Sequence, residues 1–311
     1  MAEYGMRVEI NTAALQAKYL VSLQRIVDVL TFSLAGVEHV TEERYADFKR
    51  FWHFDPAENQ RLAFDVAAEE VERWHIKHCL QDAIDVVSAF LEECRMICAF
   101  YHLATLKPAT GADYKRAVGR DRKAFHQLGL PDKIQHLKEL FGVESDWDEH
   151  VMSLNRARNC LVHRLGIVRE KDVDANGELV LIWKTIRLAV VSADGHSRRP
   201  VEGPHRVEAD ESLELEVATD RKVFRVGDRL VLTYKELLNA LFSLVHYVLA
   251  LPQSIDRYAL RVGAVTTLER RTQRVHLADG PNVAEPPSAE PSERNEPLGD
   301  GKMTEGGTTA V

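Results

Sequence analysis

The feature that most constrains the fold is a long stretch of helical periodicity that contains no helix breaker. It runs from about Ala57 to Thr105, has neither glycine nor proline, and repeats apolar residues every three or four positions. Most helices of globular domains are far shorter than this. The stretch predicts either one very long helix or two helices joined near Trp74 to His78. In both cases it indicates a mainly helical protein.

Further helical patterns lie on both sides of this stretch. A proline is expected to end the last of them at Pro252, because proline lacks the N–H that a helix interior needs. Asn11 or Thr12 is the expected N-cap of the first. The predicted ranges are Asn11 to Leu34, Thr41 to Trp52, Leu130 to Phe141, Ser145 to Gly166 and Tyr234 to Leu251.

The periodicity changes from 3.6 to 2 after Gly166, which indicates strands. Alternating or short apolar runs follow at Glu178 to Val191, Leu213 to Val217, Val223 to Val226 and Leu230 to Leu232. They predict a small antiparallel β insertion of three or four strands over residues 167–233. The charged, Gly- and Pro-containing segment 194–210 is expected to be a long mobile loop.

The helix predicted at 145–166 has an apolar side and an informative polar side. Its second half reads L-N-R-A-R-N-C-L-V-H-R-L-G. Apolar residues recur at helical spacing, and Gly166 is expected to stop the helix in the left-handed conformation. These apolar residues are Val151, Leu154, Leu161 and Leu165.

On the polar side, Arg156, Asn159 and His163 share one face, with Asn155 beside it. Arg158 lies about 140° around the helix from His163, at about 100° per residue. One helix therefore cannot place Arg158 directly over His163. A second subunit across a two-fold axis is the simplest way to bring the two together.

Arg158, Asn159 and His163 spell R-N-x-x-x-H, which resembles the R-x(4 to 6)-H signature of the HEPN (higher eukaryotes and prokaryotes nucleotide-binding) families. Only this copy combines an Asn after the Arg, leucines on both sides and a glycine stop; an Arg at similar spacing also precedes His78, His126, His205 and His276. The resemblance implies a helical bundle, here residues 1–166 and 234–275, that is usually dimeric. In many members it is a metal-independent endoribonuclease.

RNA carries its own nucleophile, because its 2′-hydroxyl can attack the adjacent phosphate once a base takes the proton. Histidine, with an ordinary pKa of about 6.5, suits that task, and arginine matches phosphate oxygens. We assign His163 as general base or acid and Arg158 as the phosphate clamp, with Arg156 as a reserve cation. Asn159 would orient the imidazole or bind ribose or phosphate. By analogy with the family, the products would be a 2′,3′-cyclic phosphate and a 5′-hydroxyl.

Two further groups of charged residues bear on RNA binding. The segment Asp113 to Gln127 is expected to be a mobile, partly helical surface element. Its cations are candidate RNA contacts or, equally, an ordinary solvated face; they are Lys115, Arg116, Arg120, Arg122 and Lys123. Acids of the long helix are expected near the groove, without spacing to tell which; they include Asp82, Asp85 and Glu92.

The net charge of −8 is concentrated at the C-terminal end. Residues 277–311 contain seven acids, Arg294 and Lys302, which makes −5 and leaves −3 for the rest. A nearly neutral body is compatible with a local basic groove for RNA. Residues 276–311 are rich in Pro, Gly, Glu and Ser and are expected to be disordered.

Composition also bears on compartment and partners. No signal segment opens the chain, and the apolar run at 237–251 is too short to span a bilayer, so we expect a cytoplasmic protein with no membrane partner. The expected partners are RNA, a second copy and, in a toxin or defence setting, a protein inhibitor. Four cysteines in helical stretches are expected to be packed, reduced thiols; they are Cys79, Cys94, Cys98 and Cys160.

Two alternatives remain open. His75, His78, Cys79 and Asp82 share a helix face at metal-ligand spacings, although no cofactor or metal is needed for the endoribonuclease reading. The other alternative keeps the bundle without catalysis, as an HEPN-like module that binds nucleotides or a protein partner.

Overall fold

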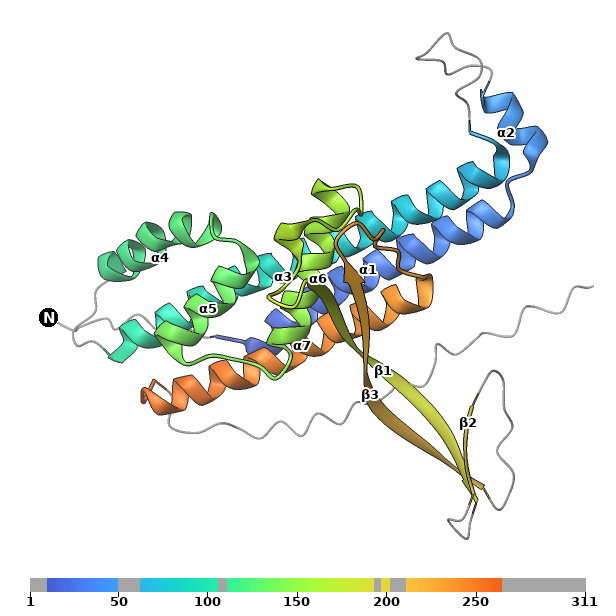
Figure 1. Ribbon diagram of the computed structural model, residues 1–311. Coiled ribbons are helices and arrows are strands. Elements are labelled where there is room, and N and C mark those ends of the chain that lie inside the picture. The colour runs from blue at the N-terminus through green and yellow to red at the C-terminus, as the bar shows by residue number, and fades with distance from the viewer. Residues whose placement is uncertain (1–9, 50–61, 106–110, 193–196, 202–210, 265–311) are drawn as a thin grey trace, which may run out of the picture. The chain divides into compact units, whose positions relative to one another are not determined.

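The computed structural model describes residues 10–49, 62–105, 111–192, 197–201 and 211–264. Within them the protein is mostly helical with a small three-stranded antiparallel sheet, as predicted (Figure 1). The helices are α1 (Thr12–Glu38), α2 (Glu42–Lys49), α3 (Phe64–Thr105), α4 (Gly111–His126), α5 (Leu130–Phe141), α6 (Asp148–His163) and α7 (Tyr234–Arg261). The 3-10 helix is η2 (Glu170–Asp172), and the strands are β1 (Glu178–Ser192), β2 (Arg198–Pro200) and β3 (Glu211–Arg225).

Helix α3 is the centre of the helical part. It is a single helix of 42 residues, so the alternative of two helices joined near Trp74 is wrong. Its middle is buried because α1, α4, α5, α6 and α7 all pack against it. Leu80, Val87, Phe90 and Leu91 are completely covered. The periodic sequence thus reflects a helix whose buried residues run from Ile76 to Leu103.

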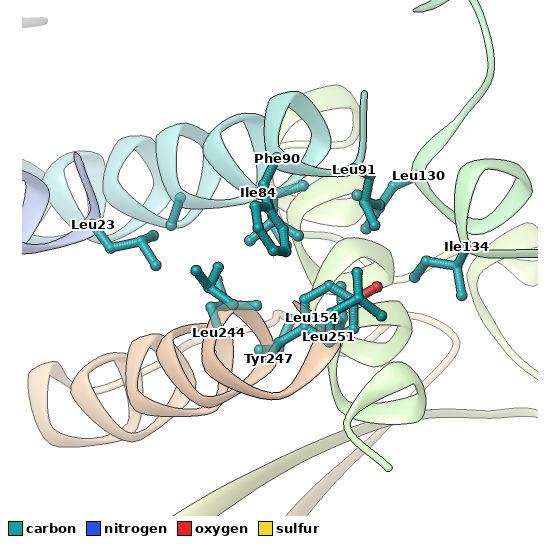
Figure 2. Packing of buried hydrophobic residues seen from close by; sticks show 14 of the residues in the cluster. Leu23, Ile84, Phe90, Leu91, Leu130, Ile134, Leu154, Leu244, Tyr247 and Leu251 are labelled. Carbon is teal, nitrogen blue, oxygen red and sulfur yellow. The ribbon is translucent and has the colours of Figure 1, made fainter. Parts of the chain in front are cut away.

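The core forms where α3, α6 and α7 meet. Figure 2 shows Ile84 and Phe90 of α3 pointing toward the face of α7 that carries Leu244 and Tyr247, and Leu154 of α6 belongs to the same cluster. Each such side chain is at most 2% exposed. Full burial of one stabilises the fold by roughly 1.5–3 kcal/mol.

The predicted end of the last helix at Pro252 is wrong, because α7 continues to Arg261. Proline disrupts a helix interior by about 3 kcal/mol, since it removes one hydrogen bond and crowds the preceding turn. Here Pro252 is itself buried, and the turns after it bury Ile255 and Tyr258. The side chain of Gln16 donates to the Leu249 carbonyl at 2.9 Å. Tertiary packing on both sides of the proline therefore outweighs the local preference.

The sheet has the order β2-β1-β3, with β1 and β3 paired without interruption from Glu178–Arg225 to Ser192–Glu211. The separate strands predicted at 213–217 and 223–226 are one strand, because the polar residues between them still pair with β1. Residues 230–232 are not a strand; their neighbour Arg229 forms only an isolated bridge with Ile167. Three strands, not four, are therefore present in the described residues.

Two serines attach β1 to the helices. The Ile182 N–H donates to Ser153 Oγ of α6 at 3.1 Å, and the Lys184 N–H donates to Ser243 Oγ of α7 at 2.8 Å. Alternate β1 residues from Leu179 to Thr185 are buried there, whereas Ile186 to Leu188 are exposed, and Ala189 and Val190 are buried again farther along the strand. The first half of the hairpin is thus docked on the bundle and the second half leaves it (Figure 1).

All strands lie between α6 and α7 in chain order, as expected for an insertion over 167–233. The division into a bundle and an insertion remains a prediction, and the tail at 276–311 lies outside the described residues. Asn11 caps α1 as predicted, by accepting a hydrogen bond from the Ala14 N–H at 2.9 Å.

By length and composition alone, α1 and α7 could each cross a membrane. The core helix of a soluble protein passes the same test, and 56% of the apolar window of α7 is buried, against 11% for α1. Because α7 runs on beyond Pro252, the expectation that its apolar run is too short to span is wrong. The cytoplasmic location and the absence of a membrane partner remain predictions.

Candidate active site

Helix α6 presents a polar strip to solvent. Arg156 and His163 are exposed and Asn159 is half-buried between them, which confirms the common face predicted from helical spacing. Asn155, expected beside this face, is instead only 6% exposed. It lies on the side of α6 that packs on the bundle, because one step of about 100° carries it past the edge of the strip.

Arg158 lies at the border between α6 and α3. Its Nη2 is 3.1 Å from Asp85 Oδ1 of α3, and its Nη1 donates to Asn159 Oδ1 at 3.1 Å. Its side chain is 21% exposed, whereas that of Asp85 is 55% exposed. Asp85 is thus the acid of the long helix that reaches the motif. Within one chain, Arg158 meets Asn159 but is not brought together with His163, in agreement with the helical geometry.

The last turn of α6 is held by an ion pair directly after His163. Arg164 Nε donates to Asp172 Oδ2 at 2.6 Å, and a second bond joins Arg164 Nη2 to Asp172 Oδ1. Their side chains are 13% and 2% exposed. Such a buried, bidentate pair fixes the position of the helix end.

The chain then reverses through two residues with positive φ. Gly166 adopts φ +78°, as expected for a helix stop, and it is preceded by Leu165 at φ +53°. Leu165 was predicted on the apolar side of the helix, but it is 77% exposed. The helix ends two residues before it, so helical spacing no longer applies to its side chain.

The basic segment is the helix α4, not only a partly helical element. Lys115, Arg122 and Lys123 are exposed, and the side chains of Arg116 and Arg120 lie outside the described part of the chain. RNA contact by these cations remains a prediction.

The C-terminal end of α4 is tied to α3 and α5 through one carboxylate. Glu92 Oε1 lies 2.9 Å from His126 Nδ1 and 2.6 Å from Lys133 Nζ. Burial of Glu92 opposes its ionisation, but the bonds to Lys133 and His126 outweigh it and lower its pKa. The basic helix is therefore anchored at the end that is closest to the bundle.

The face considered for a metal has other contacts. His75 Nδ1 and His78 Nδ1 lie 2.8 and 2.7 Å from backbone carbonyls of their own helix, and Trp74 packs on both rings. Burial raises the pKa of the Cys79 thiol to about 11, which disfavours the thiolate that a metal needs. Among the described residues, no group of three or more His, Cys, Asp or Glu side chains is arranged to hold a metal ion.

All four cysteines are buried free thiols, which confirms their expected packing role. Burial raises the pKa of Cys98 to about 12 and that of Cys160, inside the motif, above its ordinary value. None of them is therefore activated as a nucleophile.

Sequence reasoning missed a cavity of about 550 Å³ beside the polar strip. Arg156 and Glu149 of α6 line it together with Lys171, Glu178 and Arg221 from the segments that follow. These residues are far apart in the chain, and no spacing pattern links them. Only the docking of the hairpin on α6 brings them together.

No protein-family model matches this chain, and no curated protein or solved structure is similar to it at a significant level. The likeness to the HEPN families therefore rests on the motif residues and the helical surroundings alone.

Proposed function

We propose that the protein is a metal-independent endoribonuclease of the HEPN type, acting as a homodimer. The observation that carries the proposal is the placement of His163 and Arg158. His163 is exposed at the end of a well-anchored helix, and the side chain of Arg158 is 21% exposed at the adjacent α3–α6 border. A buried His163 or a fully enclosed Arg158 would have spoken against it.

In this mechanism each residue has a separate task. His163 takes the proton of the 2′-hydroxyl or returns a proton to the leaving 5′-oxygen. Arg158 stabilises the extra negative charge on the phosphate in the transition state. Asn159 orients the imidazole or binds the ribose or phosphate. It accepts a hydrogen bond from Arg158 and lies one turn before His163, so it is between the two. The products are a 2′,3′-cyclic phosphate and a 5′-hydroxyl.

The separation of Arg158 and His163 around α6 leads us to place the reacting phosphate between two subunits. Each of two sites would then combine His163 of one copy with Arg158 of the other. A site within one subunit would require α6 to unwind, which the anchoring of its last turn by Asp172 opposes.

The proposal predicts a specific complementation result. His163→Ala and Arg158→Ala should each abolish cleavage of mixed RNA in EDTA. After subunit exchange between the two variants, half of the dimers are hybrids with one intact site, so roughly a quarter of wild-type activity should return. Activity and end chemistry are measured on the same samples, with light scattering to follow the dimer.

Two results would contradict the proposal. Wild-type protein that leaves RNA intact under these conditions would favour the non-catalytic binding module. Active protein whose variants do not complement each other would place both residues in one subunit.

A further inference from the structure

The cavity beside α6 is lined by cations, by apolar side chains and by carboxylates. Its cations are Arg156, Lys171 and Arg221, and its apolar surface comes from Val180 and Ile182 of β1. Its volume of about 550 Å³ is within the range of small-molecule sites, roughly 300–1,000 Å³. The cavity is therefore large enough for a ligand with both charged and flat apolar parts.

Arg156 is available to a ligand. The acid whose pKa it helps to lower is Asp174, but that carboxylate already accepts hydrogen bonds from the N–H groups of Asn176 and Glu178, at 2.8 and 3.1 Å. These backbone bonds are the main cause of the low pKa of Asp174, and the charge of Arg156 adds to it. The exposed guanidinium keeps donors that can reach a phosphate.

The carboxylates of the cavity restrict which anion fits. Four carboxylates line it together with the cations: Glu149, Asp172, Asp174 and Glu178. Asp172 is already paired with Arg164, and Asp174 already accepts two backbone N–H groups, so Glu149 and Glu178 are the two considered for a ligand. They would repel a free anion with no donors, but they accept hydrogen bonds from a ribose hydroxyl or from an amino group on a base. The aliphatic side chains of Val180 and Ile182 offer a surface to a base. One phosphate, one sugar and one amino-bearing base satisfy all three surfaces.

The cavity is also placed correctly for a strand that passes His163. Arg156 is on the same strip of α6, seven residues or about 10.5 Å before His163. We propose that the cavity binds one nucleotide of the RNA next to the scissile phosphodiester and prefers cytosine to uracil there. The choice of RNA as ligand rests on the proposed function. The β hairpin would thereby set the cleavage preference.

Two mononucleotides test the cavity without any cleavage. Cytidine and uridine 3′-monophosphate differ at C4, where cytosine carries an amino group and uracil a carbonyl, and at N3, which carries a proton only in uracil. Calorimetry with the full-length protein should show tighter binding of the cytidine nucleotide. Arg156→Gln should weaken binding of both by roughly tenfold or more, because a charge-assisted hydrogen bond is lost. Arg25→Gln, an exposed arginine on α1, is the matched control and should change nothing.

The carboxylates have their own readout. Glu149→Gln and Glu178→Gln should reduce the preference for cytidine over uridine nucleotide, and in RNA cleavage they should relax the base preference. Absence of mononucleotide binding, equal binding by Arg156→Gln, or equally effective competition by inorganic phosphate alone would each overturn the inference. RNA cleavage by His163→Ala tests the proposed function and not the cavity, because mononucleotide binding requires no cleavage. Failure of the proposed function can therefore be distinguished from failure of this inference.

Discussion

The side chain of Arg158 has a competitor for the phosphate that it would bind. Asp85 of α3 lies 3.1 Å from its guanidinium and is 55% exposed. The pair is partly solvated, so it stabilises the fold by no more than about 1 kcal/mol. Under the proposed function its larger effect would be on RNA binding, because the carboxylate of Asp85 would repel RNA and already occupies one donor of Arg158.

Replacing this acid should therefore tighten RNA binding. Asp85→Asn keeps the shape of the side chain but removes its charge, and in a His163→Ala background it should lower the Kd for short RNA severalfold. Fluorescence anisotropy would measure this, with Asp82→Asn on the same helix as control. Weaker binding would mean that Asp85 orients Arg158 and does not compete with the substrate.

The sequence was sufficient to place some site residues and not others. Helical spacing alone predicted that Arg156, Asn159 and His163 share an exposed face. It could not select Asp85 from the acids of the long helix, because that choice depends on how α6 docks on α3. It also could not anticipate that Lys171 of η2 and Arg221 of β3 line the cavity, because only the folded arrangement of the segments after α6 brings them there.

At the scale of elements, two hydroxyls hold the hairpin on the bundle. Ser153→Ala and Ser243→Ala would leave the N–H groups of Ile182 and Lys184 without their partners in a buried contact. Each substitution should lower the free energy of unfolding by roughly 1–3 kcal/mol. Urea unfolding measures the loss, and hydrogen exchange should show it first at these two amides.

Ser33→Ala removes only an exposed hydroxyl bond within α1 and serves as the control. If the Ile182 and Lys184 amides keep their protection when both Ser153 and Ser243 are replaced by alanine, apolar packing alone holds the hairpin on the bundle.

The contact between α6 and α7 should make stability depend on pH. Trp147 stacks on His246 at a centroid distance of 5.0 Å and also contacts His150. Burial lowers the pKa of both imidazoles; the nearby charge of Lys184 adds to the effect on His150. The unfolded chain, with an ordinary pKa of about 6.5, then binds protons more readily. This contribution to stability is complete above about pH 6.5 and is lost as the pH falls through the lower folded-state values.

Thermal unfolding between about pH 7.5 and pH 5 would test this dependence. His150→Leu with His246→Phe should flatten the curve, whereas His102→Gln, an exposed residue, should not. An equally steep decline in the double variant would assign the acid sensitivity to other groups.

Local sequence patterns predicted helices and turns correctly where tertiary contacts favoured the same structure. Asn11 as one of two expected N-caps, helical structure along the stretch before Thr105, and the left-handed glycine at Gly166 followed from single residues and periodicity. The errors occurred where tertiary contacts overrode local preference. Buried neighbours carry α7 through Pro252, and pairing with β1 keeps β3 continuous across its polar middle.

For the whole molecule, the placement of charge should govern affinity for RNA. Residues 277–311 carry −5 of the total −8. Changing the seven acids to amides should strengthen RNA binding at low salt, and the difference should vanish at high salt, where screening is effective within about 3 Å. The acids are Asp279, Glu285, Glu290, Glu293, Glu296, Asp300 and Glu305. Anisotropy titrations at two salt concentrations provide the measurement, and a salt-independent change would rule out long-range repulsion.

The buried pair of Arg164 and Asp172 also determines how movement would pass through the molecule. Arg164 follows His163 directly, and Asp172 stands at the root of the hairpin. A partner that displaces the hairpin would therefore tilt the C-terminal end of α6. The Arg164–Asp172 pair keeps the last turn of the helix from unwinding, so the displacement is passed on to the helix. A displacement of the hairpin would therefore also move the imidazole of His163, and a displacement of the imidazole would move the hairpin.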